Sequence, residues 1–533
     1  MKKMKSKILF IFIPFVLLSW GCDKNFEELN VNPNSVSADI IQFEKLFSTA
    51  ELFSSGNSDG HAFDGERGNL IYCSCIIQHL ATNGYSYGDK YNFNEEYITA
   101  NWQALYPNAI KQIVDVVENT RDKSNKTNLY NIARIYKAYL FQFLTDLYGD
   151  IPYSEAGKAY VGNILLPKYD KQEDIYADLL KELDEAATAL DENAPNSLGA
   201  QDIIYGGDVI KWKQFAYSEM ARLAMRMTKV DPDKAKTWIQ KAVTGGVMTT
   251  NDDNAIVLHY AVNDAQVSNN GSGWELITEE AGQFKMSKTF IDFFKSHNDP
   301  RLHFYAAVST NPGALWNTPN FNLGDTTSSI QLGMPNGFDG LGGLVPINTA
   351  PNYPGNVNKY SIVNRYTFAR ADAPTFVLTA AETQLLLAEA AQRGWISGNA
   401  KDIYDNAVTL AFTQLIQTGA NWSESAAEAA ASSYLAQNPY NTATGLQQIN
   451  EQYWVTVFMD EYEAFANWRR SGFPSLTPVN YPNASINKTG GVIPRRLTYP
   501  LEEASTNPDN YNDAVSGLSD GNTMTSRMWW DKP

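Results

Sequence analysis

Histidine, cysteine and charged side chains are all scarce in this chain. Its 533 residues include only 5 histidines and 3 cysteines, and charged residues make up 19% of the sequence, against about 25% in average proteins. The histidines are scattered, and no HExxH motif occurs. The sequence therefore lacks the ligand pattern of a zinc hydrolase, and we predict neither a metal nor another cofactor.

Basic residues are fewer than acidic ones. The 42 Lys and Arg stand against 59 Asp and Glu, which gives a formal net charge of −17 at pH 7. Binding to a nucleic-acid backbone needs a basic field, so the charge argues against nucleic acid as a partner.

The N-terminus has only a short hydrophobic run. Ile8–Leu18 follows a basic start and is too short to span a bilayer, which predicts the h-region of an export signal. A small residue directly before Cys22 resembles the bacterial lipobox, although Ser19 stands where a leucine is usual. We therefore predict a lipoprotein signal peptide over 1–21, an acylated Cys22 and a lipid-proximal tether over 22–37. The alternative is an ordinary secretory signal that leaves Cys22 free.

The two remaining cysteines, Cys73 and Cys75, are separated by a single residue. On a helix, this spacing points their side chains to different faces. We therefore predict buried structural thiols and neither a disulfide nor a metal site.

Aromatic residues, by contrast, are abundant. The 29 Tyr, 25 Phe and 12 Trp make up 12% of the chain, and hydrophobic residues make up 44%. This apolar content is sufficient for a substantial core. We predict a globular protein with some aromatic rings at its surface.

The strongest helical pattern begins at Leu129. Apolar residues recur there at helical spacing and fall on one stripe: Ile132, Tyr136, Tyr139, Leu140, Phe143 and Leu147. Gly149 is expected to take a left-handed conformation after this helix, and Pro152 keeps the helix from resuming. We interpret the helix as scaffold.

Three pairs of amphipathic helices are predicted. The first pair joins this helix to one that starts with a capping box over Asp170–Glu173. In the second pair, Asp208 caps one helix and Asp231 precedes the proline that starts the next. The third pair is expected at 375–393 and 399–417. Repeated units of this size resemble tetratricopeptide repeats, which stack to share one core.

Two stretches lack helical periodicity and are rich in aromatic residues. One is the polar loop Ala81–Thr99, and the other is the long segment 260–366. A loop-rich stretch this long inside a globular chain is usually functional or disordered, and the density of aromatics favours a folded, functional one. We predict a mostly α fold with few short strands and a single domain over 38–533. Its parts are a helical core at 40–259 and 367–475, a ligand-side insert at 260–366, a long helix at 448–470 and an irregular C-terminal segment at 476–533.

The aromatic residues of the loop and the insert are candidate contacts for a glycan. Sugar rings expose faces of C–H groups that stack on aromatic rings, and their hydroxyls bond to polar side chains. The candidates are Tyr85, Tyr87 and Tyr91 in the first loop, and Trp274, Trp316 and Tyr353 in the insert. We expect the two groups to converge on one shallow site. The alternative is that each ring packs its loop onto the helical body.

A catalytic interpretation has little support. Glycoside hydrolysis needs two carboxyl groups at a set separation in a cleft, and no pair can be selected from 59 acidic residues without geometry. The run Asn251–Asn254 offers oxygen ligands for calcium but lacks the spacing of a loop that wraps the ion. Calcium therefore stays an open alternative that we do not predict.

Several motifs recur in order along the chain. They are the Cys22 lipobox, YLFQFLTDLYGDIPYSEA (139–156), PKYDKQEDIYADLLKELDEA (167–186), DIIYGGDVIKWKQFAYSEMARLAMRM (202–227), NDPRL (298–302), AETQLLLAEAAQRGW (381–395), EAFANWRRSGFPSL (463–476), IPRRLTYPLEE (493–503) and the terminal WWDKP. Together they resemble the SusD/RagB family of nutrient-binding outer-membrane lipoproteins of Bacteroidota, and within it the SusD-like subgroup. The resemblance covers essentially the whole mature chain.

The resemblance implies a body of tetratricopeptide-like helix pairs, held by its lipid on the outer membrane and facing the cell exterior. It implies capture of an oligo- or polysaccharide and delivery to a SusC-like TonB-dependent transporter, without catalysis. Peptides or another nutrient bound in the same way, a helical-repeat adaptor and a surface glycosidase are the alternatives. The resemblance does not assign the binding residues, because the ligand-side loops differ between members.

Overall fold

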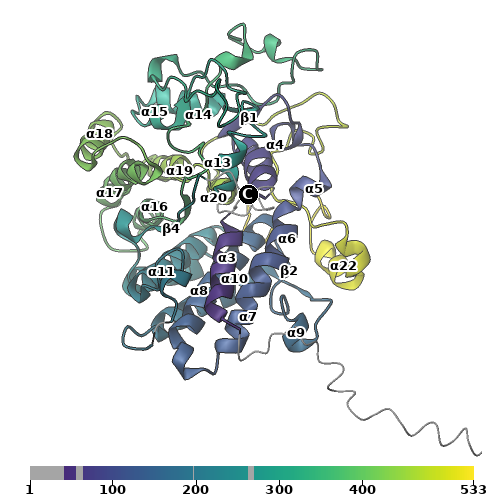
Figure 1. Ribbon diagram of the computed structural model, residues 1–533, viewed down its shortest axis with the longest axis vertical. Helices are drawn as coiled ribbons and strands as arrows, with labels where there is room; N and C mark the ends of the chain where they lie inside the picture. The colour runs from purple at the N-terminus through teal and green to yellow at the C-terminus, as the bar shows by residue number, and fades with distance from the viewer. Residues whose placement is uncertain (1–40, 56–63, 196, 262–268) are drawn as a thin grey trace, which may run out of the picture. The chain divides into compact units, whose positions relative to one another are not determined.

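Helices make up most of the described chain, and its strands are short (Figure 1). The computed structural model describes residues 41–55, 64–195, 197–261 and 269–533. The predicted signal peptide, Cys22 and the tether fall outside these residues. Glu44–Pro533 forms one compact unit. The predicted class, mostly α with few short strands, is confirmed.

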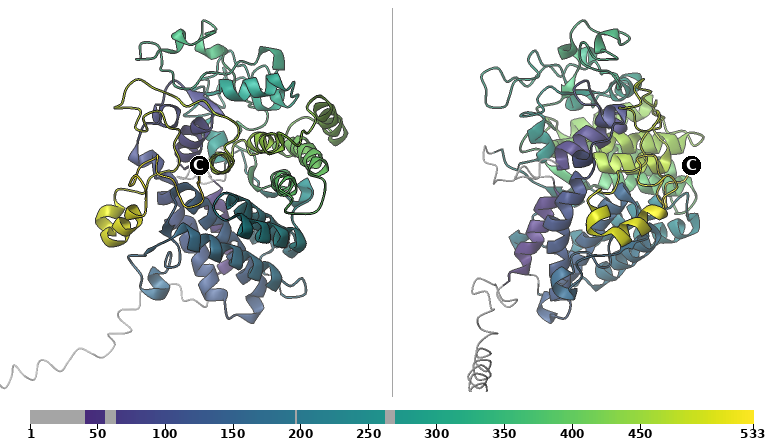
Figure 2. Two further views of the ribbon diagram at one scale, coloured as in Figure 1. Left: turned by 180° about the vertical axis from the view of Figure 1, so that it is seen from behind. Right: turned by 90° about the vertical axis from the view of Figure 1, so that its right-hand side faces the viewer.

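The longer helices stack in sequence order. They are α3 (Phe43–Ser54), α7 (Lys111–Thr120), α8 (Thr127–Tyr148), α10 (Gln172–Ala189), α11 (Val209–Arg226), α12 (Pro232–Gly245), α16 (Ala380–Gln392), α17 (Ala400–Thr413), α18 (Glu424–Gln437), α19 (Gly445–Thr456) and α20 (Glu461–Ser471). From α7 to α12, each helix of this series packs on the next, and α17 packs on both α16 and α18. Figures 1 and 2 show α8, α10 and α11 side by side. This arrangement is the predicted stack of helix pairs.

The strands of the described residues form two-stranded antiparallel sheets. The pairs are β1 (Leu80–Thr82) with β5 (Phe284–Met286), β2 (Ile151–Pro152) with β3 (Tyr169–Asp170), β4 (Ala255–Val257) with β8 (Thr375–Leu378), and β6 (Ala306–Ala307) with β7 (Ile362–Val363). The β1–β5 pair joins the first aromatic loop to the insert.

Short helices occupy much of the remaining chain. They are η1 (Asp64–Ser74) and η2 (Tyr106–Ile110), which are π-helical, α4 (Tyr87–Lys90), α5 (Glu95–Ile98), α6 (Ala100–Leu105), α9 (Ala159–Gly162), α13 (Gly271–Glu275), α14 (Lys288–Ser296), α15 (Leu302–Tyr305), α21 (Glu503–Thr506) and α22 (Pro508–Ser516). The 3₁₀ turns are Ser124–Lys126, Gly199–Gln201, Asn251–Asp253, Ser328–Ile330, Ile347–Thr349, Val357–Lys359 and Gln414–Thr418. Cys73 and Cys75 are buried, as predicted.

Helix α8 is buried on nearly every side. It packs against α7, α10, α11 and α20, so residues off the predicted stripe, such as Ala133 and Leu144, are as buried as Ile132. The helix ends at Tyr148, and Gly149 follows with φ 91° and ψ −127°. The sequence correctly predicts a positive φ at Gly149, but its ψ lies outside the left-handed region, so the predicted left-handed conformation is wrong. This backbone region favours glycine and turns the chain directly into β2.

The start of α10 differs from the predicted capping box. Asp170 lies in β3, where it accepts a hydrogen bond from Ser154 N at 2.7 Å. The first N–H of α10, on Gln172, donates instead to Asp150 Oδ1 at 2.8 Å. The capping carboxylate thus comes from the exit of α8, because pairing of β2 with β3 brings the two segments together.

The caps of the second predicted pair are confirmed. Asp208 accepts from the N–H groups of Ile210 and Lys211 at the start of α11. Asp231 accepts from Lys234 N at the start of α12. In both caps the donor and the acceptor are fewer than four residues apart, so the sequence alone is enough to predict them.

Three other predictions are wrong in extent. Residues 375–378 form β8, and α16 begins only after Thr379, which caps it. The helix expected at 448–470 is two helices, α19 and α20, because Met459 takes φ 76° and Asp460 caps the second. Helical periodicity was not expected in the insert, yet α14 is an amphipathic helix there.

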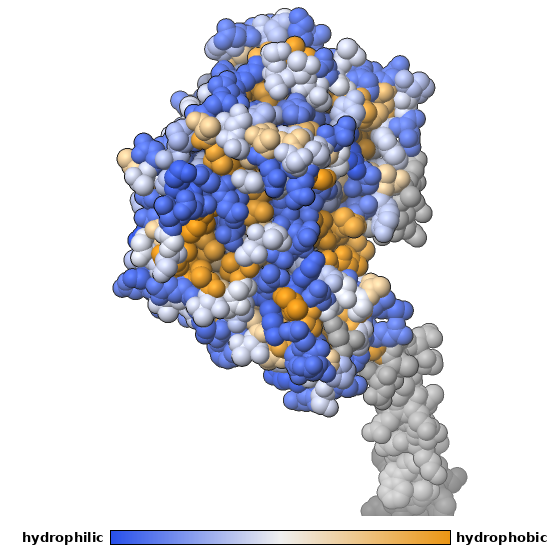
Figure 3. All heavy atoms as spheres, turned by 90° about the vertical axis from the view of Figure 1, so that its left-hand side faces the viewer, coloured by the Kyte–Doolittle hydropathy of each residue, from blue (hydrophilic) through white to orange (hydrophobic). Residues whose placement is uncertain are grey.

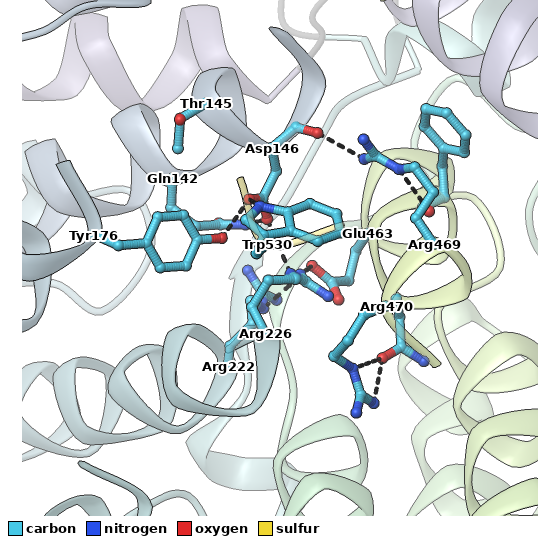
Figure 4. A network of polar contacts seen from close by, with 12 residues as sticks. Gln142, Thr145, Asp146, Tyr176, Arg222, Arg226, Glu463, Arg469, Arg470 and Trp530 are labelled. Carbon is cyan, nitrogen blue, oxygen red and sulfur yellow. Dashed lines mark hydrogen bonds and ion pairs between the residues drawn. The ribbon is translucent and has the colours of Figure 1, made fainter. Parts of the chain in front are cut away.

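A buried network of ion pairs joins helices that lie far apart in the sequence (Figure 4). Arg226 of α11 contacts Asp146 of α8 at 3.1 Å and Glu463 of α20 at 2.6 Å. Arg222, one turn earlier, contacts Glu382 of α16 at 2.8 Å. Burial alone would lower the pKa of Arg226, but the surrounding carboxylates raise it well above its ordinary value. The arginines therefore stay charged and hold four helices together.

Asp146 extends the network to the C-terminal segment. Its Oδ1 accepts hydrogen bonds from Trp530 Nε1 at 3.0 Å and from the hydroxyl of Tyr176. Its backbone carbonyl accepts from Arg469 Nη2 at 2.6 Å. Trp530 is fully buried, so the end of the chain is part of the core.

Removal of Arg226 tests this network. In Arg226→Met, Asp146 and Glu463 lose an ion pair but remain buried, so we expect the free energy of unfolding to fall by about 3 to 5 kcal/mol. Chemical denaturation followed by circular dichroism measures the loss. Lys241→Met is the matched control, because its ion pair with Asp184 is partly exposed and is worth about 1 kcal/mol or less. Equal losses in both variants would contradict the structural role of the network.

Candidate functional site

The first loop presents a cluster of half-buried tyrosine rings. The rings of Tyr85 and Tyr87 lie 6.0 Å apart, and Tyr87 contacts Tyr97 edge-to-face at 5.0 Å. Tyr85 also stacks on Phe284 of β5, at 6.0 Å and 15° between the ring planes. These contacts hold the rings while part of each stays accessible.

Tyr91 does not belong to this accessible group. Its side chain is 1% exposed and its backbone takes φ 61°. Its hydroxyl accepts a hydrogen bond from Val479 N at 3.1 Å, and its carbonyl accepts one from Lys488 N at 3.0 Å. Tyr91 therefore anchors the loop to the C-terminal segment, and its proposed ligand contact is corrected to a packing role.

Two tryptophans of the insert form a second aromatic group. Trp274 of α13 and Trp316 meet edge-to-face, with ring centroids 5.6 Å apart and planes at 70°. Both are half-buried. The backbone of Trp316 is fixed by a hydrogen bond from its N–H to Ile277 O at 2.8 Å. The pair therefore presents two rings at nearly right angles in a fixed arrangement.

One hydrogen bond joins the two aromatic groups. The hydroxyl of Tyr85 donates to Glu280 Oε1 at 2.6 Å. Glu280 lies close to α13, because its N–H donates to Glu275 O at 2.9 Å. The first loop and the insert thus meet at this segment, as the expected convergence requires. We refer to Tyr85, Tyr87, Tyr97, Trp274 and Trp316 as the aromatic site.

Tyr353 lies outside the aromatic site. Its half-buried ring is 6.4 Å from that of Tyr360 and packs on a small core that includes Met334 and Ile347. Its role in the described structure is to close this core. The contact of Tyr353 with a ligand stays a prediction.

Three buried glutamates lie beneath the aromatic site. Glu66, Glu275 and Glu280 are between 4 and 7% exposed. Burial and then the charge of Glu280 raise the pKa of Glu66 to about 7, and burial and then the charge of Glu66 raise the pKa of Glu275 to about 8. Sequence reasoning missed this cluster, because Glu66 lies about two hundred residues before the other two.

The carboxyl cluster has no metal-site geometry. Among the residues that the structure describes, no three His, Cys, Asp or Glu side chains are placed to hold a metal ion. Within Asn251–Asn254, the alternative calcium position, Asp253 Oδ2 accepts hydrogen bonds from the N–H groups of Thr249 and Thr250 at 2.9 Å. That carboxylate is a cap for a 3₁₀ turn.

A cavity of about 100 Å³ with both polar and apolar lining lies beside the insert. Amide side chains from three segments line it, namely Asn69, Asn101 and Asn270, together with aromatic side chains of α8 and α20. Asn101 Nδ2 is buried and has no partner among the described residues. The two carboxyls that reach the cavity, Glu382 and Asp460, are held by Arg222 and by a helix cap. The cavity is therefore suited to hydrogen bonding.

Exposed apolar side chains are distributed over the surface. Figure 3 shows apolar patches set among hydrophilic side chains on one face. The most exposed large apolar side chain is Tyr160 of α9, at 82%. None of the helices in the described part is both long and apolar enough to cross a membrane.

The helical stack with its aromatic-rich insert defines a class of helical-repeat binding scaffold. A family profile described as "Starch-binding associating with outer membrane" matches residues 47–500. The chain therefore belongs to the SusD-like family. No curated protein matches the sequence.

Solved structures of this family resemble most of the chain. A chitin-binding protein is 33% identical, with a TM-score of 0.79, and the match covers 92% of this chain and 100% of that one. A Bacteroidetes SusD-like structure is 28% identical, with a TM-score of 0.76 and the same coverage. A chitin-binding SusD homologue from Flavobacterium johnsoniae is 23% identical, with a TM-score of 0.71 over 92% of this chain and 98% of that one, and shows likeness of fold.

Glu275→Gln tests the buried glutamates. Because the pKa of Glu275 is raised from 4.5 to about 8, the folded protein keeps a proton that the unfolded chain releases. The free energy of unfolding of the wild type should therefore fall as the pH rises between these values. Glutamine carries no charge, so the free energy of unfolding of the variant should fall less as the pH rises. Near pH 8 the variant should be more stable than the wild type by at least about 1 kcal/mol. Urea unfolding across the pH range measures it. The exposed Glu502→Gln is the control, and identical pH profiles for both variants would count against the raised pKa.

Proposed function

We propose that this protein is a non-catalytic, cell-surface glycan-binding lipoprotein. The observation that supports it most is the aromatic site, in which two loops remote in sequence place half-buried rings around one segment. Rings at different angles can stack on successive sugar units, while nearby amides and carboxyls take hydroxyl hydrogen bonds. The family description as starch-binding is consistent with such a ligand.

We propose chitin oligosaccharides as the first ligand class to examine. The relative at 33% identity is a chitin-binding protein, and it is matched along its entire length. N-acetylglucosamine offers both an apolar ring face and an amide, which suit aromatic rings and polar side chains respectively. Starch oligosaccharides, peptides and other nutrients are the alternative ligands that the same surface could take.

The proposal includes delivery to a membrane partner. An acylated Cys22 would hold the body on the outer membrane, facing the cell exterior, where it would pass its ligand to a SusC-like TonB-dependent transporter. Membership of a family described as associating with the outer membrane supports this part of the proposal.

Trp274→Ala tests the aromatic site. The substitution removes one half of the tryptophan pair, and a stacked ring is worth about 1.4 kcal/mol or more, so we expect the Kd for an N-acetylglucosamine hexasaccharide to rise at least about tenfold. Isothermal titration calorimetry measures the affinity. Tyr160→Ala is the matched control, because Tyr160 is an exposed ring on α9. It should leave the Kd unchanged.

Several outcomes of this titration are informative. If Trp274→Ala binds with unchanged affinity and Tyr160→Ala loses affinity, the ligand binds away from the insert. No binding of chitin or starch oligosaccharides by the wild type would favour a peptide ligand or an adaptor role. Release of shorter sugars during the titration would revive the glycosidase alternative.

Membrane attachment and partnership are tested in one preparation. The native protein, extracted from outer membranes with detergent, should begin at Cys22 and carry acyl chains by mass spectrometry. The same preparation should contain a TonB-dependent barrel. An unmodified N-terminus at another residue would refute the lipid anchor, and repeated isolation without a barrel would refute the transporter partnership.

A further inference from the structure

The chain around α9 carries three strongly exposed apolar side chains. Tyr160 is 82% exposed, Leu165 73% and Leu166 57%. No charged residue lies between Lys158 and Lys168, so the segment is uncharged throughout. Single exposed leucines are common on protein surfaces, whereas several in one short loop indicate a surface that makes a contact. We refer to residues 159–167 as the α9 loop.

The backbone of the α9 loop is held at both ends, although its apolar side chains are exposed. At its start, Lys158 Nζ pairs with Glu118 Oε1 at 3.4 Å, and Gly162 N donates to Lys158 O at 2.8 Å. Near its end, Leu166 O accepts a hydrogen bond from Asn510 Nδ2 of α22 at 3.2 Å. The loop therefore has a defined backbone that presents its apolar side chains to the outside.

The α9 loop lies at the end of α7 where the N-terminal part of the chain enters the body. Glu118, the partner of Lys158, is in the last turn of α7. Glu44, at the start of α3, forms an ion pair with Lys126, just beyond the same end of α7. Figure 1 shows α9 beside α7. The start of α3 and the α9 loop are therefore attached to the body at neighbouring points.

The proposed lipid anchor would bring this end of the body to the membrane. Cys22 precedes Glu44 by 22 residues, which span at most about 80 Å when fully extended. Because the α9 loop lies where this chain enters the body, the anchor would hold the loop at a high effective concentration relative to the lipid. This step rests on the proposed acylation of Cys22, whereas the exposure of the loop does not.

A lipid surface fits the α9 loop better than a protein partner does. Three side chains present a few hundred Å² at most, against about 800 Å² per partner in a stable protein interface. A bilayer needs no matching shape, and leucine beside tyrosine is a usual combination at its interface. Lys158 and Lys168 flank the loop with partly exposed side chains, and such lysines can extend their ammonium groups to lipid phosphates.

We propose that the α9 loop is a membrane contact, in which Tyr160, Leu165 and Leu166 enter the headgroup region of the bilayer. The partner is the lipid surface in general, because the loop has no pocket that would select one headgroup. A lipid anchor alone limits the distance of the body from the membrane but not its orientation. The loop supplies a second point of attachment, which determines the side of the body that faces the lipid.

Lipid quenching of a fluorescent label tests the contact. The chain from Asp23 is held by an N-terminal hexahistidine tag on phosphatidylcholine vesicles with a nickel-chelating lipid, so the test does not depend on acylation. An NBD label on Leu165→Cys should be quenched by doxyl-labelled lipid at least about threefold more than one on Leu341→Cys. Leu341 is the matched control, because it lies in the insert and is 72% exposed. Cys73 and Cys75 are buried and do not compete for the label.

A second pair of variants separates the loop from the label. An NBD label on Tyr160→Cys should lose at least about two thirds of its quenching when Leu165→Asn and Leu166→Asn are added, because the leucines provide the apolar contact. All three side chains are exposed, so the fold should be unchanged by circular dichroism. Undiminished quenching after both leucines are replaced would overturn the proposal.

The remaining outcomes distinguish the occupants of the loop. Equal quenching at positions 165 and 341, or none at either, would overturn the membrane contact. Absence of quenching on vesicles, with protection of the label by a co-purified barrel, would overturn it and assign the loop to a protein partner. Quenching in the tagged protein, with an unmodified N-terminus in the native protein, would refute the lipid anchor of the proposed function and support the membrane contact.

Discussion

The structure depends on the ion pairs that two arginines of α11 make inside the helical stack. Arg222 and Arg226 contact Asp146, Glu382 and Glu463, which come from three other helices. A buried carboxylate without a partner is strongly destabilising, so each helix is held in the one register that completes these pairs. Apolar packing alone would tolerate small sliding of helices, whereas charged contacts at these distances do not.

This rigid stack supports a ligand side that is built from loops. The segment from α13 to β5 is its centre: Trp274 faces Trp316, Glu280 holds Tyr85, and Phe284 lies under the same tyrosine. Buried acids gather on one part of this segment, and a buried lysine lies at its end. Protonation of these acids relieves their mutual repulsion, so pH should act on the segment that carries the aromatic site.

Local signals predicted much of the fold correctly. The caps at Asp208 and Asp231 were found because each acts within a few residues of its own position. The cap of α10 was assigned to Asp170, but Asp150 provides it, since strand pairing brings a residue from the preceding loop to the helix start. The break at Met459 was missed for a similar reason. The helical pattern continues through Met459, whereas the backbone there takes a positive φ and its carbonyl accepts a hydrogen bond from Asn69 Nδ2, far away in the sequence, at 3.0 Å.

The class of this protein follows from its sequence, because ordered motifs and helical periodicity are local features that can be recognised without knowing which residues are neighbours in space. The sequence also located the aromatic-rich regions from which the site is formed. Which rings remain accessible depends on contacts between distant segments. Tyr85 and Tyr91 stand six residues apart in the same loop, yet Tyr91 is buried, and its hydroxyl accepts a hydrogen bond from the N–H of Val479, almost four hundred residues away. The exposure of a side chain depends on the residues that surround it in space, and the fold determines which residues those are.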